Sequence, residues 1–71
     1  TSRIAIANSN VPNMVGQIST LLATAGFNIA DLLNKSRGEL AYTIVDVEGA
    51  VPATLVNEIR GIQGVLSARL I

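Results

Sequence analysis

The 71-residue chain contains no cysteine and no histidine. Without cysteine, no disulfide can stabilise the fold and no thiolate can hold a metal ion, so a C-x-x-C copper-chaperone site is excluded. Without histidine or cysteine, the usual pairs of base and nucleophile cannot be assembled. We therefore expect no metal site, no cofactor and no nucleophilic catalysis in this chain.

Aromatic residues and charge of one sign are also scarce. Phe27 and Tyr42 are the only aromatic side chains, and five basic residues balance five acidic ones along the chain. RNA-binding domains stack bases on aromatic side chains and neutralise phosphates with a basic surface. Because the sequence has neither feature, we expect no nucleic-acid partner.

Long apolar runs are missing, and none approaches the roughly 20 residues that cross a bilayer. A secretory signal is not predicted either, because the polar residues Asn8, Ser9 and Asn10 follow Arg3 too soon. We expect a cytoplasmic protein with no membrane partner.

The length suits one small domain. Such a domain buries only about 60% of the surface that its unfolded chain exposes, and domains without disulfides often gain stability by association. With 49% hydrophobic residues, we expect residues 1–71 to be a single domain, excised from a larger chain, that pairs with a second copy.

The first half of the chain predicts a strand and a helix. Residues 3–8 alternate as a short strand, and the apolar positions after Pro12 recur with helical spacing until Gly26, a residue typical of helix ends. Gly16 lies inside this helix, where glycine costs about 1 kcal/mol relative to alanine. We interpret that cost as a sign of close packing against the helix rather than of ligand contact.

The second half predicts two strands, a helix and a final strand. Residues 28–37 and 39–48 form a hairpin around Gly38, although "ADLLNK" in the first strand is also compatible with a helix. A helix begins at Pro52 and ends by Gly61 or Gly64. Residues 65–71 form the last strand, with Leu66, Ala68 and Leu70 on one face.

This βαββαβ order predicts the fold. Right-handed crossovers place both helices on the same face of the sheet. We therefore expect an α+β, ferredoxin-like sandwich with a four-stranded antiparallel sheet and two helices on one face. Asp31, Asp46 and Glu48 are candidate acids, but solvated strand ends are the simpler interpretation, so no catalytic residue is predicted.

Four asparagines gather around the first helix: Asn8, Asn10, Asn13 and Asn28. Free N–H groups at a helix N-terminus favour a carboxylate, and a carboxamide offers both a donor and an acceptor. Such a set can bind the ammonium and carboxylate groups of an amino acid. Asparagine is also a favoured cap and turn residue, so a purely structural role is the alternative.

Three segments resemble the ACT-domain family. They are "N-x-N-x-P-x-x-V-G-x-I-x-x-L-L-A-x-A-G-F-N-I" (8–29), "AYTIVDVEG" (41–49) and "IRGIQGVLSARLI" (59–71). Within that family the chain is similar to the C-terminal regulatory domains of D-3-phosphoglycerate dehydrogenases, the NAD-dependent enzymes that open serine biosynthesis. The resemblance covers residues 3–71.

This resemblance implies a regulatory function and a site. ACT domains of such dehydrogenases pair side by side and bind L-serine between the strand–helix loop of one copy and the start of the second strand of its neighbour. The implied contacts are Asn8 and Asn10 from the loop and Asn28 from the neighbouring copy, and we expect Val11 and Asn13 to line the same site. Asn8 stands where serine-inhibited members carry histidine, and Asn13 where the family often has glycine.

Two functions follow for this non-catalytic domain. The first is a sensor that binds a small amino acid, L-serine foremost, at a homodimer interface and modulates an attached phosphoglycerate dehydrogenase. The second is an assembly module without a ligand, in which the asparagines only cap helices and pair strands.

Overall fold

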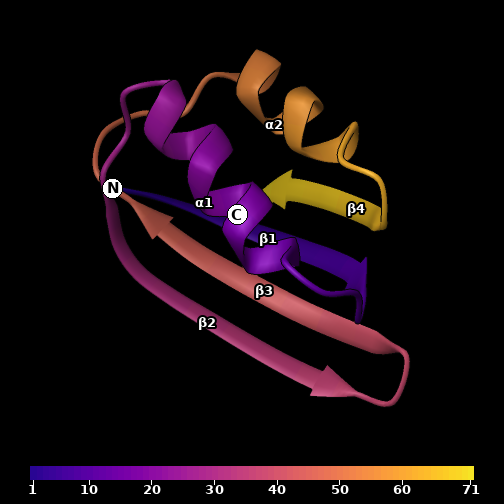
Figure 1. Cartoon of the computed structure of the whole chain (residues 1–71). Helices are drawn as coiled ribbons and strands as arrows, with labels where there is room; N and C mark the ends of the chain where they lie inside the picture. Colours follow the sequence, from indigo (N-terminus) through magenta and orange to yellow (C-terminus); the bar gives the residue numbers. More distant parts are fainter.

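The computed structural model describes residues 1–71. The chain forms β1 (Ser2–Ser9), α1 (Met14–Thr24), β2 (Ile29–Arg37), β3 (Leu40–Val47), α2 (Ala53–Arg60) and β4 (Val65–Leu70). The strands make one antiparallel sheet in the order β2-β3-β1-β4, and both helices cover the same face (Figure 1). The predicted ferredoxin-like βαββαβ sandwich is confirmed, and residues 29–37 are a strand rather than a helix.

The core lies between this sheet face and the two helices. Alternate residues of the central strands, including Ile4 and Ile6 of β1 and Val45 and Val47 of β3, point toward the helices and are fully buried. From the helices, the buried apolar residues are Met14, Ile18, Leu22, Leu55, Val56 and Ile59. Complete burial of each large aliphatic side chain contributes about 1.5–3 kcal/mol.

Helix α1 begins two residues later than Pro12 predicts. Asn13 takes the left-handed conformation at φ 63°, which breaks the helical path between Pro12 and Met14. At the other end, Gly26 has φ +88°, its N–H donates to the Ala23 carbonyl, and the Phe27 N–H donates to the Leu22 carbonyl. This is a Schellman motif, so the predicted stop at Gly26 is confirmed.

The close approach predicted at Gly16 comes from a different group than expected. A Cβ added to Gly16 would collide with Oδ1 of Asn13, the residue just before α1, rather than with the sheet or the other helix. Glycine at this position therefore leaves room for the Asn13 side chain.

The last strand is more exposed than its sequence pattern suggests. Ala68 is buried, but Leu66 and Leu70 are 62% and 43% exposed. β4 is an edge strand, and a register shift opposite Ala7 and Asn8 disturbs its alternation. The helices thus cover only part of this strand.

Candidate functional site

The loop between β1 and α1 is anchored at both sides. The Asn10 N–H donates to the Glu39 carbonyl at 2.7 Å and Asn10 Nδ2 donates to the Gly38 carbonyl at 3.0 Å, which ties the loop to the turn between β2 and β3. The Ser9 N–H donates to the Gly64 carbonyl at 2.7 Å, just before β4. The loop therefore lies across one end of the sheet in a fixed position.

Asn8 lies inside the protein, on the helix-covered face of β1. It is 1% exposed; its Oδ1 accepts from Thr43 Oγ1 at 3.1 Å, and its Nδ2 donates to the Ser9 carbonyl at 2.9 Å. Asn34 Nδ2 in turn donates to Thr43 Oγ1 at 2.8 Å. Both ends of the Asn8 carboxamide are thus paired within the chain, and the network links three neighbouring strands.

Thr43 and Asn34 are parts of this region that the sequence analysis missed. A signal was present for Thr43, because it shares a strand face with the apolar residues Ala41, Val45 and Val47. A hydroxyl in such a position needs a buried partner. No comparable signal exists for Asn34, which the fold brings to Thr43 from the neighbouring strand.

Asn13 is exposed beside the first turn of α1 and makes no side-chain cap hydrogen bond. No acidic residue lies in that first turn. The first N–H groups of a helix have no partner within the helix and carry partial positive charge. The Asn13 carboxamide is therefore exposed and lies beside Gly16 in this first turn.

Asn28 lies at the opposite end of the sheet within one chain. Ile29, the next residue, pairs with Val47, whereas Gly38 and Asn10 lie beyond the other end of β2 and β3. Strands rise about 3.3 Å per residue, so the length of β2, from Ile29 to Arg37, puts roughly 26 Å between the two ends. The Asn28 side chain is exposed and makes no hydrogen bond within the chain, while its carbonyl accepts from the Glu48 N–H at 3.0 Å. A single chain therefore does not bring Asn28 to Asn10.

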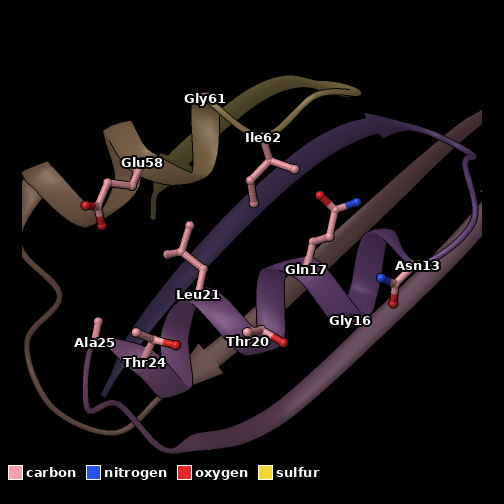
Figure 2. Close-up of a pocket in the computed structure, with 10 residues that line it drawn as sticks. All are labelled: Asn13, Gly16, Gln17, Thr20, Leu21, Thr24, Ala25, Glu58, Gly61 and Ile62. Atoms are coloured by element: carbon pink, nitrogen blue, oxygen red, sulfur yellow. The ribbon is translucent and has the colours of Figure 1, made fainter.

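Two hollows flank the loop and α1. Val11 lines a small one of about 530 Å³, together with Ser9, Gln17, Gln63 and Gly64. A wider groove of about 930 Å³ runs between α1 and α2, with Asn13 at one end and Thr24 and Ala25 at the other (Figure 2). Small side chains on α1 leave this groove open, and Glu58 is the only charged residue that lines it.

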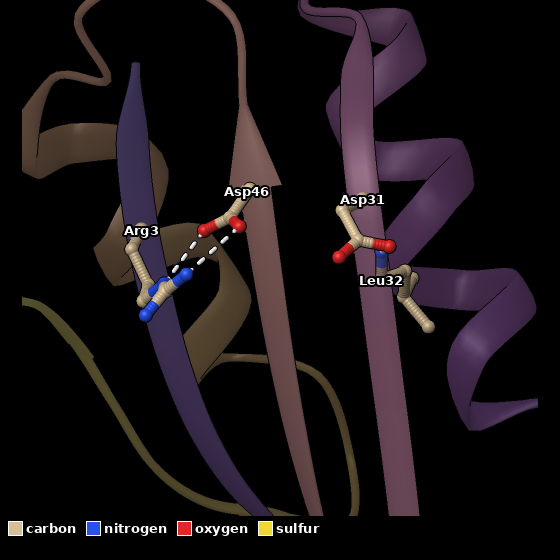
Figure 3. Close-up of polar contacts among 4 residues, drawn as sticks. All are labelled: Arg3, Asp31, Leu32 and Asp46. Atoms are coloured by element: carbon tan, nitrogen blue, oxygen red, sulfur yellow. Dashed lines mark hydrogen bonds and ion pairs between the residues drawn. The ribbon is translucent and has the colours of Figure 1, made fainter.

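An ion pair between Arg3 and Asp46 lies at the end of the sheet opposite the loop between β1 and α1. Arg3 Nε donates to Asp46 Oδ1 at 2.7 Å and Nη2 donates to Oδ2 at 3.1 Å across β1 and β3 (Figure 3). The hydrogen bond with Arg3 is the largest cause that lowers the pKa of Asp46 below its ordinary 3.8. The same contact raises the pKa of Arg3.

This pair predicts a weak acid dependence of stability. Because the folded-state pKa of Asp46 lies below 3.8, its contribution is complete above that value and is lost as the pH falls through the folded pKa. With Asp46 replaced by Asn, the free energy of unfolding should fall less steeply as the pH drops below 4. Its dependence on pH near neutrality should not change. Thermal unfolding at pH 2–7 checks this, and an unchanged acid limb would contradict it.

The structure contains no group of three or more His, Cys, Asp and Glu residues that could hold a metal ion. Neither of its helices has the length and apolar content needed to cross a membrane.

No protein-family model matches the chain, and no curated protein matches its sequence. Solved structures do match. The crystal structure of the ACT domain from the GTP pyrophosphokinase of Chlorobium tepidum superposes with a TM-score of 0.82 at 18% identity, covering 99% of this chain and 95% of that one. The solution structure of the same domain gives a TM-score of 0.79 at 19% identity, covering 99% of this chain and 83% of that one.

Longer proteins contain the same fold. The ligand-free regulatory subunit of aspartate kinase from Thermus thermophilus matches with a TM-score of 0.76 at 13% identity, with 99% of this chain and 49% of that chain covered. A homoserine dehydrogenase from Thiobacillus denitrificans matches with a TM-score of 0.75 at 15% identity. The match covers 99% of this chain and 17% of the dehydrogenase. The chain therefore has the fold of ACT domains. The narrower resemblance to phosphoglycerate dehydrogenases stays a prediction.

Proposed function

We propose that the chain is a non-catalytic regulatory domain that binds a small amino acid, L-serine foremost, between two copies. On this proposal it is one domain of a larger chain and modulates an attached phosphoglycerate dehydrogenase. The ACT fold and its presence in a kinase regulatory subunit support this class of function. The observation that carries the site is the anchoring of Asn10 on the turn beside the exposed edge strand β2.

β2 offers the surface for pairing. It is an edge strand of nine residues, Ile29–Arg37, so one row of its backbone N–H and C=O groups faces solvent. Such an edge pairs readily with another strand. A second copy related by a two-fold axis perpendicular to the sheet would add its own β2 in antiparallel fashion and keep the helices of both copies on one face.

One register of that pairing completes the site. If Leu33 faces Leu33 of the second copy, then Asn28 of the second copy comes to the Arg37–Gly38 end of β2, one residue of offset being set by the register shift between Ile29 and Asp31. The Gly38 carbonyl at that end already accepts from Asn10. The same register sets Asp31 opposite Lys35 at two symmetry-related places, and opposite charges directly across strands are favourable. If the two-fold axis moves from Leu33 to Asp31, the two Asp31 side chains face each other. If it moves to Lys35, the two Lys35 side chains do, and like charges directly across strands are unfavourable.

The chemistry of the completed site suits an amino acid. Asn10 uses one N–H on Gly38 and retains a second N–H and its Oδ1, while the Asn28 carboxamide is unpaired. Amide N–H groups can then bind a carboxylate and amide oxygens an ammonium group, with Val11 and Asn13 lining the loop side. Asn8, which is buried and paired, serves by holding the loop in place.

Regulation requires that the ligand prefer one arrangement of the two copies. An amino acid that bridges Asn10 and Asn28 of the second copy binds only the paired form, so it shifts the population toward that form. Catalytic domains attached to each copy would respond to the change in pairing.

Replacing Asn10 with alanine tests the sensor directly. Titration with L-serine by calorimetry should show saturable heat for the native chain and at least about tenfold weaker binding for Asn10→Ala, because a hydrogen bond to a charged group is worth about 1.5–3 kcal/mol. Asn57→Ala, an exposed asparagine on α2, is the matched control and should bind as the native chain does. Absence of heat from the native chain at millimolar serine would contradict the proposal.

An assembly module without ligand is the second candidate. The hydrogen bond from Asn10 to the Gly38 carbonyl is common to both candidates, and in this one its structural role is the whole role of the side chain. In that case Asn10→Ala would destabilise the loop while serine binds neither protein.

A further inference from the structure

The sheet face away from the helices has an uneven profile. On this outer face β3 carries the large residues Tyr42 and Ile44, and the neighbouring strand β1 carries Ala7 and Ala5 directly beside them. Tyr42 is 67% exposed. Over these two pairs the face therefore has a ridge on β3 and a trough on β1, which is bounded by Arg3 along the strand and by Arg69 of β4 beside Ala5.

We propose that this outer face packs against the same face of a second copy, about a two-fold axis parallel to the strands and midway between β1 and β3. Such an axis places β3 of each copy over β1 of the other. Ile44 and Tyr42 then enter the trough above Ala5 and Ala7 of the second copy. The surface is distinct from the β2 edge, so the proposal does not depend on the serine site.

Charge supports the same axis. Arg3 and Asp46 occupy one end of this face as an ion pair within the chain (Figure 3). Under the strand-parallel axis, Arg3 of each copy lies over Asp46 of the other, so four alternating charges meet. The two central strands are thus complementary to themselves in charge as well as in shape, while on the flanking strands Arg69 lies over Leu33 and Lys35 over Ser67 of the other copy.

The other two-fold arrangement is worse. An axis in the same plane but perpendicular to the strands sets Ile44 against Tyr42 and Ala5 against Ala7. Large residues would then meet large ones and leave a gap above the alanines, which forfeits contact. Arg3 would face Ser9 rather than a carboxylate.

The available area is sufficient for an interface. Four strands about 4.8 Å apart and about 26 Å long offer roughly 500 Å² of plane per copy, or about 1,000 Å² for two. That total reaches the lower bound of about 1,000 Å² for a biological interface. Aligned sheets cross at about −30°, which keeps the central rows in contact.

Charge reversal in trans tests the pairing. In an Arg3→Asp homodimer, each of the two contacts between residues 3 and 46 joins two aspartates. In an Asp46→Arg homodimer, each of these contacts joins two arginines. Each variant alone should therefore associate at least tenfold more weakly than the native chain in sedimentation equilibrium. An equimolar mixture should recover association, because each contact then joins opposite charges even though the ion pair within both chains is lost. Glu58→Arg on α2 is the control and should leave association unchanged.

A second variant separates association from folding. Ala7→Phe fills the trough that Tyr42 of the second copy would occupy, yet phenylalanine suits a strand better than alanine. In dilute solution, Ala7→Phe should unfold at the same temperature as the native chain or at a higher one. At higher concentration it should associate at least tenfold more weakly than the native chain. The proposal would be overturned if Arg3→Asp and Ala7→Phe both associate as strongly as the native chain. It would also be overturned if the mixture shows no recovery, or if the native chain does not self-associate except through the β2 edge.

Discussion

A Leu33→Cys variant should form a disulfide-linked dimer on mild oxidation, whereas Asp31→Cys and Lys35→Cys should stay largely monomeric on a non-reducing gel. The chain has no native cysteine, so each variant carries a single thiol. Leu33 is half exposed at the middle of β2. In the register that brings Asn28 to Gly38 of the second copy, the two Leu33 residues face each other across the two-fold axis.

Strand geometry explains the expected selectivity. Residues directly opposite in an antiparallel pair have Cα atoms about 4.5–5.5 Å apart, within the 4.4–6.8 Å that disulfides accept. In the same register two copies of Lys35 lie four residues apart along the strands, or about 13 Å, and so do two copies of Asp31. We expect most of the Leu33→Cys protein to cross-link and less than about a tenth of either control, given that misaligned cysteines cannot be bridged without backbone movement.

The three cysteine positions each report a different register. Efficient cross-linking of Lys35→Cys would move the two-fold axis by two residues and separate Asn28 from Gly38 of the second copy, which would contradict the proposed serine site. Failure of all three variants would remove the β2 edge as the interface. Because the outer-face proposal uses other residues, it would stand or fall separately.

A Thr43→Val variant should lose about 1–3 kcal/mol of unfolding free energy, the cost of leaving a buried polar group unpaired. Thr43 is fully buried, and its hydroxyl links Asn34 to Asn8. Valine keeps the shape but leaves Oδ1 of Asn8 without a donor. A domain of this length has about 4–11 kcal/mol in total, and each kcal/mol shifts the melting temperature by about 4–8 °C.

A double variant tests whether the network acts as a unit. Asn8→Leu combined with Thr43→Val removes both polar partners, and Asn34, which is exposed, can pair with water. The Ser9 carbonyl still accepts from the Val11 N–H. The double variant should therefore recover most of the lost stability, as replacement of both partners by apolar groups can be nearly neutral.

The control for this cycle is Thr54→Val, which changes an exposed threonine of α2 in the same way. It should alter stability by no more than about 0.5 kcal/mol. Equal losses for Thr43→Val and Thr54→Val, or a double variant that loses the sum of both single changes, would show that the Asn8–Thr43 contact does not stabilise the fold.

The elements and their order could be predicted because local patterns determine them. Alternation in β1, helical spacing in α1 and Gly26 at its end each act within a few residues, and the βαββαβ order then restricts the topology. Boundaries were less predictable. The left-handed Asn13, which delays α1 past Pro12, lies in a loop whose preceding residues are hydrogen-bonded to Gly38 and Gly64, far away in the sequence.

The roles of the asparagines were not fixed by local pattern. Asn8 and Asn10 are two residues apart, yet one is buried under the helices and the other lies exposed on the far side of a turn. What separates them is the partner that each meets: Thr43 is 35 positions away from Asn8, and Gly38 is 28 positions away from Asn10. Pairings at such separations depend on strand order and register.

The sequence by itself determined the elements, the ferredoxin-like class and the absence of thiol and imidazole chemistry, because composition and short-range periodicity are properties of neighbouring residues. Only the tertiary structure decided which carboxamide is buried, which is anchored beside the open edge of β2, and that Asn28 lies at the far end of the same sheet. Those facts depend on the register of the β2–β3 and β1–β3 pairs, which joins residues that no local pattern connects.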